Sequence, residues 1–162
     1  MKTQYQYNNR EVVLEVKKAS LMVRVVLYIL VFLCVALPIV GIVGGVVSGG
    51  EGMSILGIVL FAFILFLGYF VFRLALWNTY GKEEISFGKE VIYYQADYGW
   101  FKDKRKKYDV GKTVKFAAKQ MGYQEDNKGV LTVEVDMRPI NSAVKMPMAE
   151  VEQLIKELKK LY

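Results

Sequence analysis

Two long uncharged runs of apolar residues constrain this chain more than any other feature. Residues 25–47 form a run of 23 residues without a charge, and residues 53–72 form a second run of 20. In a helix, at ~1.5 Å rise per residue, these runs reach ~34 and ~30 Å, and the hydrocarbon core of a bilayer is ~30 Å thick. Both runs are therefore predicted to cross a membrane as helices, over about residues 25–47 and 53–73.

The charges around the two runs predict how they are oriented. The connection, residues 48–52 with the sequence SGGEG, contains no Lys or Arg, whereas both flanks do: Arg10, Lys17, Lys18 and Arg24 before the hairpin, and Arg73, Lys82 and Lys89 after it. The positive-inside rule then places both termini in the cytoplasm, as expected for a multi-pass protein of the inner (plasma) membrane. About 20 polar residues precede the first run, which favours an uncleaved start over a signal peptide.

Other residues of the hairpin, residues 21–77, indicate how it is anchored and packed. Arg73, Trp77 and Tyr80 lie where interface anchors are expected. Gly41, Gly45 and Gly49 follow a spacing of four, which lets two helix backbones approach closely. This glycine face could pack against the second span or against another chain. The spans contain no ionisable residue before Arg73, which argues against a pump or carrier.

The polar parts of the chain show other periodicities. In the lead, residues 1–20, Val12, Leu14 and Val16 fall on one side and Val13, Glu15 and Lys17 on the other, which favours a strand over residues 11–17; an interfacial helix is the rival interpretation. Residues 78–162 form a second region, in which period-two patterns predict strands at 83–87, 90–98, 112–119 and 130–137. An apolar stripe then predicts an amphipathic helix over about residues 148–161, with Val151, Leu154, Ile155, Leu158 and Leu161 on one side. The predicted fold is a membrane α-helical hairpin plus an α+β region, an antiparallel sheet of about five strands closed by the C-terminal helix.

The residue types give little support for catalysis. The chain has no histidine, so the commonest general base and metal ligand is absent, and its single cysteine, Cys34, lies inside the first span. Gly111-Lys112-Thr113 lacks the upstream glycine of a phosphate loop, because position 106 is Lys. The segment Glu125-Asp126-Asn127 lacks the spacing of a calcium loop. We expect no enzyme activity, no cofactor and no metal.

A basic cluster between two predicted strands, in the sequence YGWFKDKRKKYDV, is the strongest candidate site. Its members are Lys102, Lys104, Arg105, Lys106 and Lys107, with Trp100 beside them. As the tip of a β-hairpin such a cluster can simply be a solvated turn that prevents edge pairing. Held near a membrane it can instead contact anionic lipid, at about 1 kcal/mol per cation, with Trp100 in the headgroup layer. Nucleic acid is not expected as a partner.

The order of these segments resembles bacterial membrane proteins with a pleckstrin-homology-like (PH-like) domain beside a transmembrane hairpin. The resemblance lies in "LWNTYGKEEISF" after the second run, the period-two segments around "VIYYQADY" and "TVKFAAK", and "VKMPMAEVEQLIKELKKL" at the end. It implies a PH-like antiparallel sheet or partly open barrel. Such domains commonly carry an apolar-Pro or apolar-Trp pair where "YDVGKTV" stands here. A PH-like fold has seven strands, and about five or six are predicted here, so we hypothesise that residues 11–17 add a strand to the sheet.

The resemblance implies no catalytic residues, because PH-like domains chiefly bind peptides, proteins or lipid headgroups. The expected function is display of this domain at the cytoplasmic face for protein or anionic-lipid interaction, with membrane lipids, another membrane protein or a second copy as partners. The alternatives are a structural subunit that assembles a membrane complex through the glycine face and, third, an enzyme that works at the interface.

Overall fold

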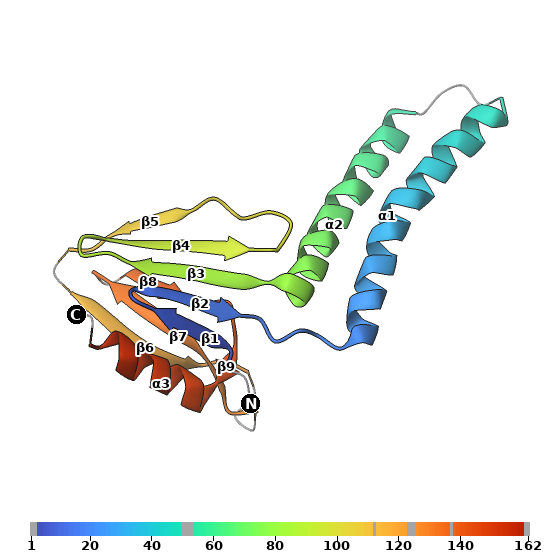
Figure 1. Cartoon of the computed structure of the whole chain (residues 1–162). Coiled ribbons are helices and arrows are strands. Elements are labelled where there is room, and N and C mark those ends of the chain that lie inside the picture. Colours follow the sequence, from blue (N-terminus) through green and yellow to red (C-terminus); the bar gives the residue numbers. More distant parts are fainter. Residues whose placement is uncertain (1–2, 50–53, 112, 123–125, 137, 161–162) are drawn as a thin grey trace. The chain divides into compact units, whose positions relative to one another are not determined.

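The chain forms two compact units in a computed structural model that describes residues 3–49, 54–111, 113–122, 126–136 and 138–160. The first unit combines Met1–Lys17 with Tyr80–Tyr162, and the second is Lys18–Thr79. Figure 1 shows the helical hairpin and the sheets with their element labels. The α+β unit is therefore discontinuous in sequence, because the hairpin unit is inserted into it.

The hairpin unit consists of helices α1 (Leu21–Val47) and α2 (Ile55–Tyr80). Both are long and apolar enough to cross a membrane. α1 begins one turn before the predicted span, where the Ser20 hydroxyl accepts a hydrogen bond from the Val23 N–H. α2 continues beyond Arg73, and its last turn includes Asn78 and Thr79, whose side chains donate to backbone carbonyls four residues earlier. The helices are thus longer than their uncharged cores.

The first sheet of the α+β unit has five antiparallel strands in the order β1–β2–β3–β4–β5. These are β1 (Tyr5–Asn8), β2 (Glu11–Glu15), β3 (Lys82–Phe87), β4 (Val91–Asp97) and β5 (Lys106–Asp109). β2 comes before the hairpin and β3 after it, yet they pair along their lengths, from Glu11 opposite Ser86 to Glu15 opposite Lys82. Val12 and Leu14 are fully buried, and the Val16 N–H extends the pairing to the Gly81 carbonyl. The lead thus contributes the additional strand that was hypothesised.

The second sheet consists of β6 (Val114–Gln120), β7 (Lys128–Val135), β8 (Arg138–Asn141) and the short β9 (Met146–Pro147). Helix α3 (Met148–Leu158) follows directly and packs on β6 and β7. Four residues of its predicted apolar stripe are buried: Val151, Leu154, Ile155 and Leu158. The amphipathic pattern therefore predicted this element correctly, and Leu161 lies outside the described residues.

Two expectations about the sheets need correction. The strands form two sheets that are not closed into a barrel, and nine strands occur in the described residues instead of about five or six. The missed strands are β1, β5, β8 and β9, which have two to four residues each. Segments this short cannot show a convincing period of two, because the pattern needs several repeats.

Buried aromatic and acidic side chains connect the two sheets. The rings of Phe87 on β3 and Phe116 on β6 meet edge to face, with centroids 5.7 Å apart. The carboxylate of Glu83, also on β3, is fully buried and accepts hydrogen bonds from the backbone N–H groups of Ala143 (2.7 Å) and Val144 (3.3 Å). These contacts fix β3 against the loop between β8 and β9.

Candidate interaction surfaces

The basic cluster lies on one edge of the five-stranded sheet. Residues 98–105 connect β4 to β5, and Lys106 and Lys107 belong to β5, which is an edge strand in the strand order. The expectation of a basic hairpin tip is therefore wrong for these two lysines. A row of cations along a sheet edge also discourages pairing with another strand.

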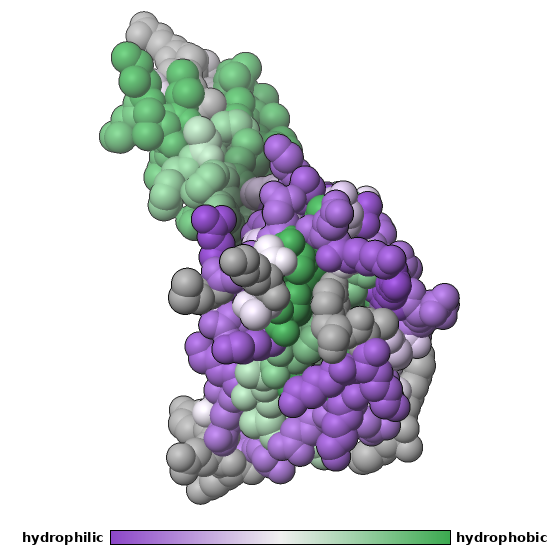
Figure 2. Space-filling view, turned by 90° about the vertical axis from the view of Figure 1, so that its left-hand side faces the viewer, coloured by the Kyte–Doolittle hydropathy of each residue, from purple (hydrophilic) through white to green (hydrophobic). Residues whose placement is uncertain are grey.

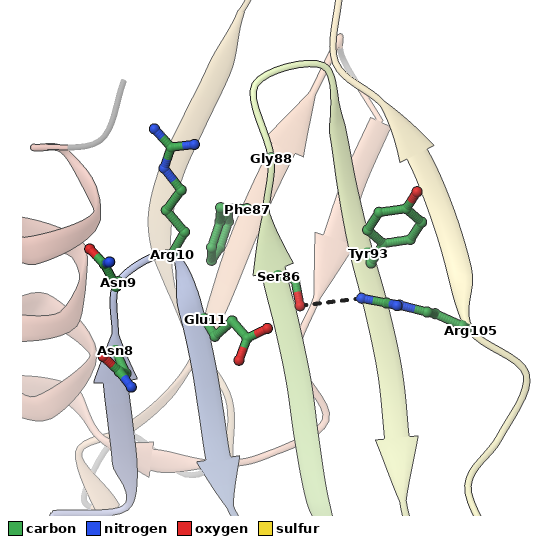
Figure 3. A pocket seen from close by; sticks show the side chains of 9 residues that line it. All are labelled: Asn8, Asn9, Arg10, Glu11, Ser86, Phe87, Gly88, Tyr93 and Arg105. Atoms are coloured by element: carbon green, nitrogen blue, oxygen red, sulfur yellow. Dashed lines mark hydrogen bonds between the residues drawn. The ribbon is translucent and has the colours of Figure 1, made fainter.

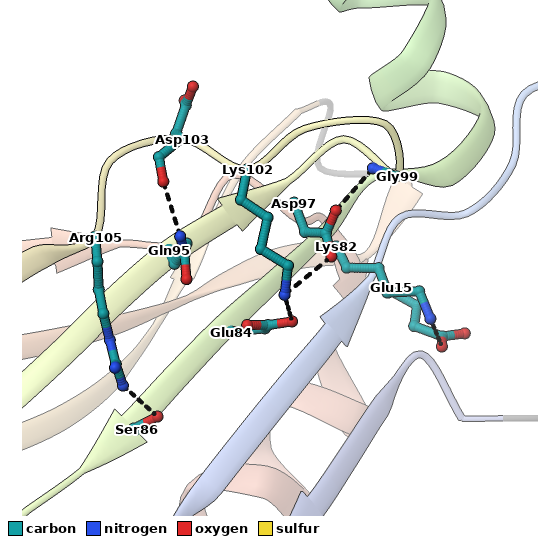
Figure 4. A network of polar contacts seen from close by, with 10 residues as sticks. All are labelled: Glu15, Lys82, Glu84, Ser86, Gln95, Asp97, Gly99, Lys102, Asp103 and Arg105. Carbon is teal, nitrogen blue, oxygen red and sulfur yellow. Dashed lines mark hydrogen bonds and ion pairs between the residues drawn. The ribbon is translucent and has the colours of Figure 1, made fainter.

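The connection runs back beside β4, where Lys102 forms a β-bridge with Asp97 and the Asp103 N–H donates to the Ala96 carbonyl at 2.9 Å. Its Lys102 and Arg105 side chains reach over the sheet to Glu84 and Ser86 (Figure 4). The Lys102 ammonium lies 2.6 Å from a carboxylate oxygen of Glu84 and 3.3 Å from one of Asp97. The Gln95 amide donates to the Asp103 carbonyl at 2.9 Å. Hydrogen bonding to Glu84 raises the pKa of Lys102, and the positive charge of Lys102 is balanced by carboxylates of the same chain.

Two further members of the cluster have partners inside the chain. The Arg105 guanidinium lies 4.2 Å from the centre of the Tyr93 ring and 3.5 Å from the Ser86 hydroxyl, to which it donates. Lys107 pairs with Asp109 at 2.8 Å, and this hydrogen bond raises the pKa of Lys107. Three of the five cations, Lys102, Arg105 and Lys107, therefore have partners within the chain, and these three are less available to a membrane.

Lys104 and Lys106 differ from these three cations. Neither has an ion pair within the described part of the chain, although Lys106 lies 5.9 Å from the centre of the Tyr94 ring. Both side chains are exposed. Their charges are available to an external anion.

The pairing of β3, β4 and β5 shows which end of the basic cluster is level with the start of β3. Asp97 pairs with Lys82, which follows α2 by two residues, whereas Lys107 pairs with Tyr93. Asp97 and Tyr93 are four residues apart on β4, so these two pairs are separated by about 13 Å at ~3.3 Å per residue. The cluster thus begins at the end of the sheet where the chain enters and leaves the hairpin, and it runs away from that end along β5.

The loop that begins the cluster, residues 98–101, presents an exposed tryptophan and is called the Trp100 loop below. Trp100 is 71% exposed. The preceding Gly99 has φ +85°, and a Cβ atom there would lie 2.6 Å from the Cβ of Tyr80, the last residue of α2. The rings of Tyr98 and Phe101 stack at 4.9 Å. The loop is therefore packed against the end of α2 while its indole faces outward.

The predicted anchors of α2 occupy its last three turns. The Arg73 guanidinium donates to the Tyr69 hydroxyl at 3.4 Å, one turn earlier. Trp77 is partly buried and Tyr80 is exposed. The structure places these side chains between the uncharged part of α2 and the first strand that follows it.

The predicted glycine face of α1 does not pack against α2 in the described residues. Gly49 lies beyond the end of α1 with φ +75°, so the expectation that it belongs to a helix face is wrong. Cβ atoms built at the two glycines of the predicted face that α1 does contain, Gly41 and Gly45, would meet no atom within 4 Å. The close approach of the two helices occurs at Gly68 instead, where a Cβ would lie 3.0 Å from the Cβ of Cys34. Of the two uses predicted for the glycine face, packing within the hairpin is therefore wrong, and the face is open.

A shallow pocket of about 440 Å³ lies at the other end of the five-stranded sheet, between the β1–β2 and β3–β4 turns. We call it the distal pocket, because it is at the end opposite Glu15 and Lys82. Figure 3 shows its lining, which consists of Asn8, Asn9, Arg10, Glu11, Ser86, Phe87, Gly88, Tyr93 and Arg105. Sequence reasoning missed it, since its walls come from three separate segments.

The Glu83 carboxylate was also missed. Besides two backbone N–H groups, it accepts a hydrogen bond from the Tyr94 hydroxyl at 2.5 Å. Burial raises the pKa of Glu83, although its hydrogen bonds lower it, and burial together with the Glu83 charge raises the pKa of Tyr94. In the described residues no group of three or more acidic or cysteine side chains could hold a metal ion. The role we assign to Glu83 is to join the sheets.

Comparison with protein-family models, curated proteins and solved structures finds no match to this chain.

Proposed function

We propose that this chain is a non-enzymatic integral protein of the inner (plasma) membrane that displays a PH-like α+β domain at the cytoplasmic face, where the domain interacts with proteins or anionic lipid. Its hairpin crosses the membrane twice. The antiparallel sheets and the C-terminal helix α3 support the PH-like part of the proposal.

The pairing of β2 with β3 is the observation that carries the proposal. Glu15 and Lys82 lie opposite each other in one sheet, although helices α1 and α2 separate them in the chain. If the helices span a bilayer, both must return the chain to the same side, because a strand pair cannot form across hydrocarbon. The absence of Lys and Arg from residues 48–52, with cations on both flanks, makes that side the cytoplasm.

The Trp100 loop supports contact with lipid headgroups. It packs on Tyr80, at the end of a helix long enough to span, and its indole is exposed. Indole rings favour the membrane–water interface because they combine an apolar body with one N–H donor. Lys104, which lacks an ion pair in the described chain, can add attraction to anionic lipid, whereas the charge of Lys102 is balanced by Glu84 and Asp97.

Cysteine labelling tests the topology. In a Cys34→Ala background, Ser48→Cys places a thiol at the end of α1 and Lys119→Cys places one on β6, where the side chain is exposed. A membrane-impermeant maleimide added to intact cells should label the first variant alone, and permeabilised cells should give labelling of both. Labelling of Lys119→Cys in intact cells would overturn the proposal.

A second candidate function is assembly of a larger membrane complex through α1. The specific observation is the open glycine face of α1, since Gly41 and Gly45 meet nothing from α2. Close helix packing in lipid depends on such small residues, because lipid provides no hydrophobic driving force between helices. The face could receive a helix of a second copy or of another membrane protein.

A further inference from the structure

The distal pocket combines two arginines with polar groups from both neighbouring turns. Arg10 comes from the β1–β2 turn, and Arg105 reaches the pocket from the start of β5, with Ser86 and Phe87 between them in Figure 3. Asn8 and Asn9 supply amide groups on the side of β1. Glu11 is the one carboxylate in the lining.

Arg10 has a backbone conformation that arginine rarely adopts. Asn8 pairs with Glu11, so Asn9 and Arg10 form a two-residue hairpin loop, with φ values of +42° and +90°. Positive φ at both positions defines a type I′ turn, in which glycine is strongly preferred at the second position. An arginine there costs stability, and strain of this kind points to a role for the side chain.

Arg105 is held ready for a planar anion. Its guanidinium lies over the Tyr93 ring and donates to the Ser86 hydroxyl, which leaves other N–H donors of the same plane without a partner among the described residues. Stacking on an aromatic ring fixes the orientation of the guanidinium, so less entropy is lost when it binds a carboxylate with two parallel hydrogen bonds.

The two arginines are not neutralised within the described chain. Neither forms an ion pair there, and the Glu11 carboxylate lies within 4 Å of neither cationic group. Glu11 would repel a dianion such as phosphate, but it can accept hydrogen bonds from peptide N–H groups beside an acidic side chain. The pocket therefore suits a carboxylate carried on a peptide better than a free phosphate.

We propose that the distal pocket binds an acidic side chain of an extended peptide segment in a protein partner. Arg105 would hold the carboxylate, Arg10 would close over it from the turn, and Asn8, Asn9 and Glu11 would bond the adjoining peptide. A lipid headgroup is disfavoured because the pocket lies at the end of the sheet opposite Glu15 and Lys82, where the chain continues into the helices.

This inference deepens the proposed function, because it names the chemistry of a protein partner for the displayed domain. The two can fail separately. Maleimide labelling reports only the side of the membrane, whereas peptide binding to the purified chain does not depend on that side.

The test is NMR titration of the full chain in lipid nanodiscs with an acetylated and amidated Gly-Glu-Glu-Gly peptide. The expected result is saturable shifts of the Asn9, Arg10 and Ser86 amides, and no such shifts with the matched Gly-Gln-Gln-Gly peptide. Arg105→Lys keeps the charge but loses the planar donor pair, so its affinity should fall about tenfold. Lys115→Gln, which removes an exposed cation of β6, should bind like the wild type.

Arg10→Gly separates binding from folding. Glycine relieves the type I′ turn, so this variant should melt at a higher temperature than the wild type while it binds the peptide several-fold more weakly. Unchanged affinity in both arginine variants would overturn the proposal, as would equal binding of the glutamine peptide. Shifts produced by inorganic phosphate but not by the glutamate peptide would overturn it in favour of a phosphate site.

Discussion

The hairpin and the α+β unit distribute apolar residues in opposite ways. α1 has no buried residue, and large apolar side chains such as Phe32 and Leu37 are more than 60% exposed. In the α+β unit, by contrast, Val12, Ile92 and Leu131 are fully buried. Figure 2 shows a hydrophobic surface over the hairpin and a mostly hydrophilic surface over the other unit, with a narrow hydrophobic strip. The two units therefore suit different surroundings, an apolar one for the hairpin and an aqueous one for the α+β unit.

The hairpin unit interrupts the α+β unit in the sequence, since Lys18–Thr79 lies between its two parts. The hairpin connects β2 to β3. Because these strands are antiparallel neighbours, a short turn could connect them as well. We therefore expect the α+β unit to fold without the hairpin, whose role in the proposed function is to hold this unit at the membrane.

The largest expected effect comes from removing the hairpin. If residues 18–79 are replaced by Asn-Gly, Lys17 and Tyr80 face each other across a two-residue turn in the register that pairs Glu15 with Lys82. We expect a folded, monomeric protein that is soluble without detergent. Circular dichroism and size-exclusion chromatography measure this outcome.

The matched control is residues 80–162 alone, which lack β1 and β2. Without these strands the core loses the buried side chains of Val12 and Leu14, and the apolar residues that pack on them become exposed to water. This fragment should therefore aggregate or remain unfolded. Equal solubility and folding of both proteins would show that the lead is not part of the unit.

A smaller effect is expected from glycine substitutions in the hairpin. Gly68→Leu forces a side chain against Cys34, where even a Cβ lies at 3.0 Å, and should destabilise the helix pair by about 1–3 kcal/mol. Gly41→Leu with Gly45→Leu meets open space within the chain. Thermal denaturation in detergent should therefore separate the two variants.

The same pair of glycines decides the second candidate function. Chemical crosslinking in native membranes should lose oligomers or a co-purifying membrane protein in Gly41→Leu with Gly45→Leu if the face mediates assembly. Crosslinked products identical to those of the wild type would leave the glycine face as a lipid-facing surface.

The smallest effect concerns the buried Glu83. Its pKa is raised by burial, so between its ordinary value near 4.5 and the raised value the folded state keeps a proton that the unfolded state has lost. Stability therefore decreases as pH rises through this window. Glu83→Gln cannot ionise and should lack this decrease.

Melting temperatures from pH 4 to pH 7 measure the effect. The wild type should be most stable relative to Glu83→Gln at pH 4, and the difference should shrink or reverse toward pH 7. Glu152→Gln, an exposed position on α3, is the control for the loss of one acidic side chain. A difference between wild type and Glu83→Gln that does not vary with pH would contradict the prediction.

Much of the fold could be predicted because its signals are local. The 3.6-residue spacing of Val151, Leu154 and Leu158 predicted α3, and the alternation in residues 130–135 predicted most of β7. The short strands β1 and β5 escaped prediction, because four residues do not establish a period. The candidate site was predicted only in part, since the partners of Lys102 and Arg105 come from β3 and β4.

Two helices that can span a bilayer, and the helix that closes the chain, follow from the amino-acid sequence, because length, hydropathy and helical spacing are properties of continuous segments. The pairing of the lead with β3, the joining of the two sheets by Glu83 and the open glycine face became known from the folded structure. The folded structure also shows which cations of the basic cluster are already engaged. These features depend on contacts between distant segments, and composition does not encode which of the many compatible partners a side chain meets.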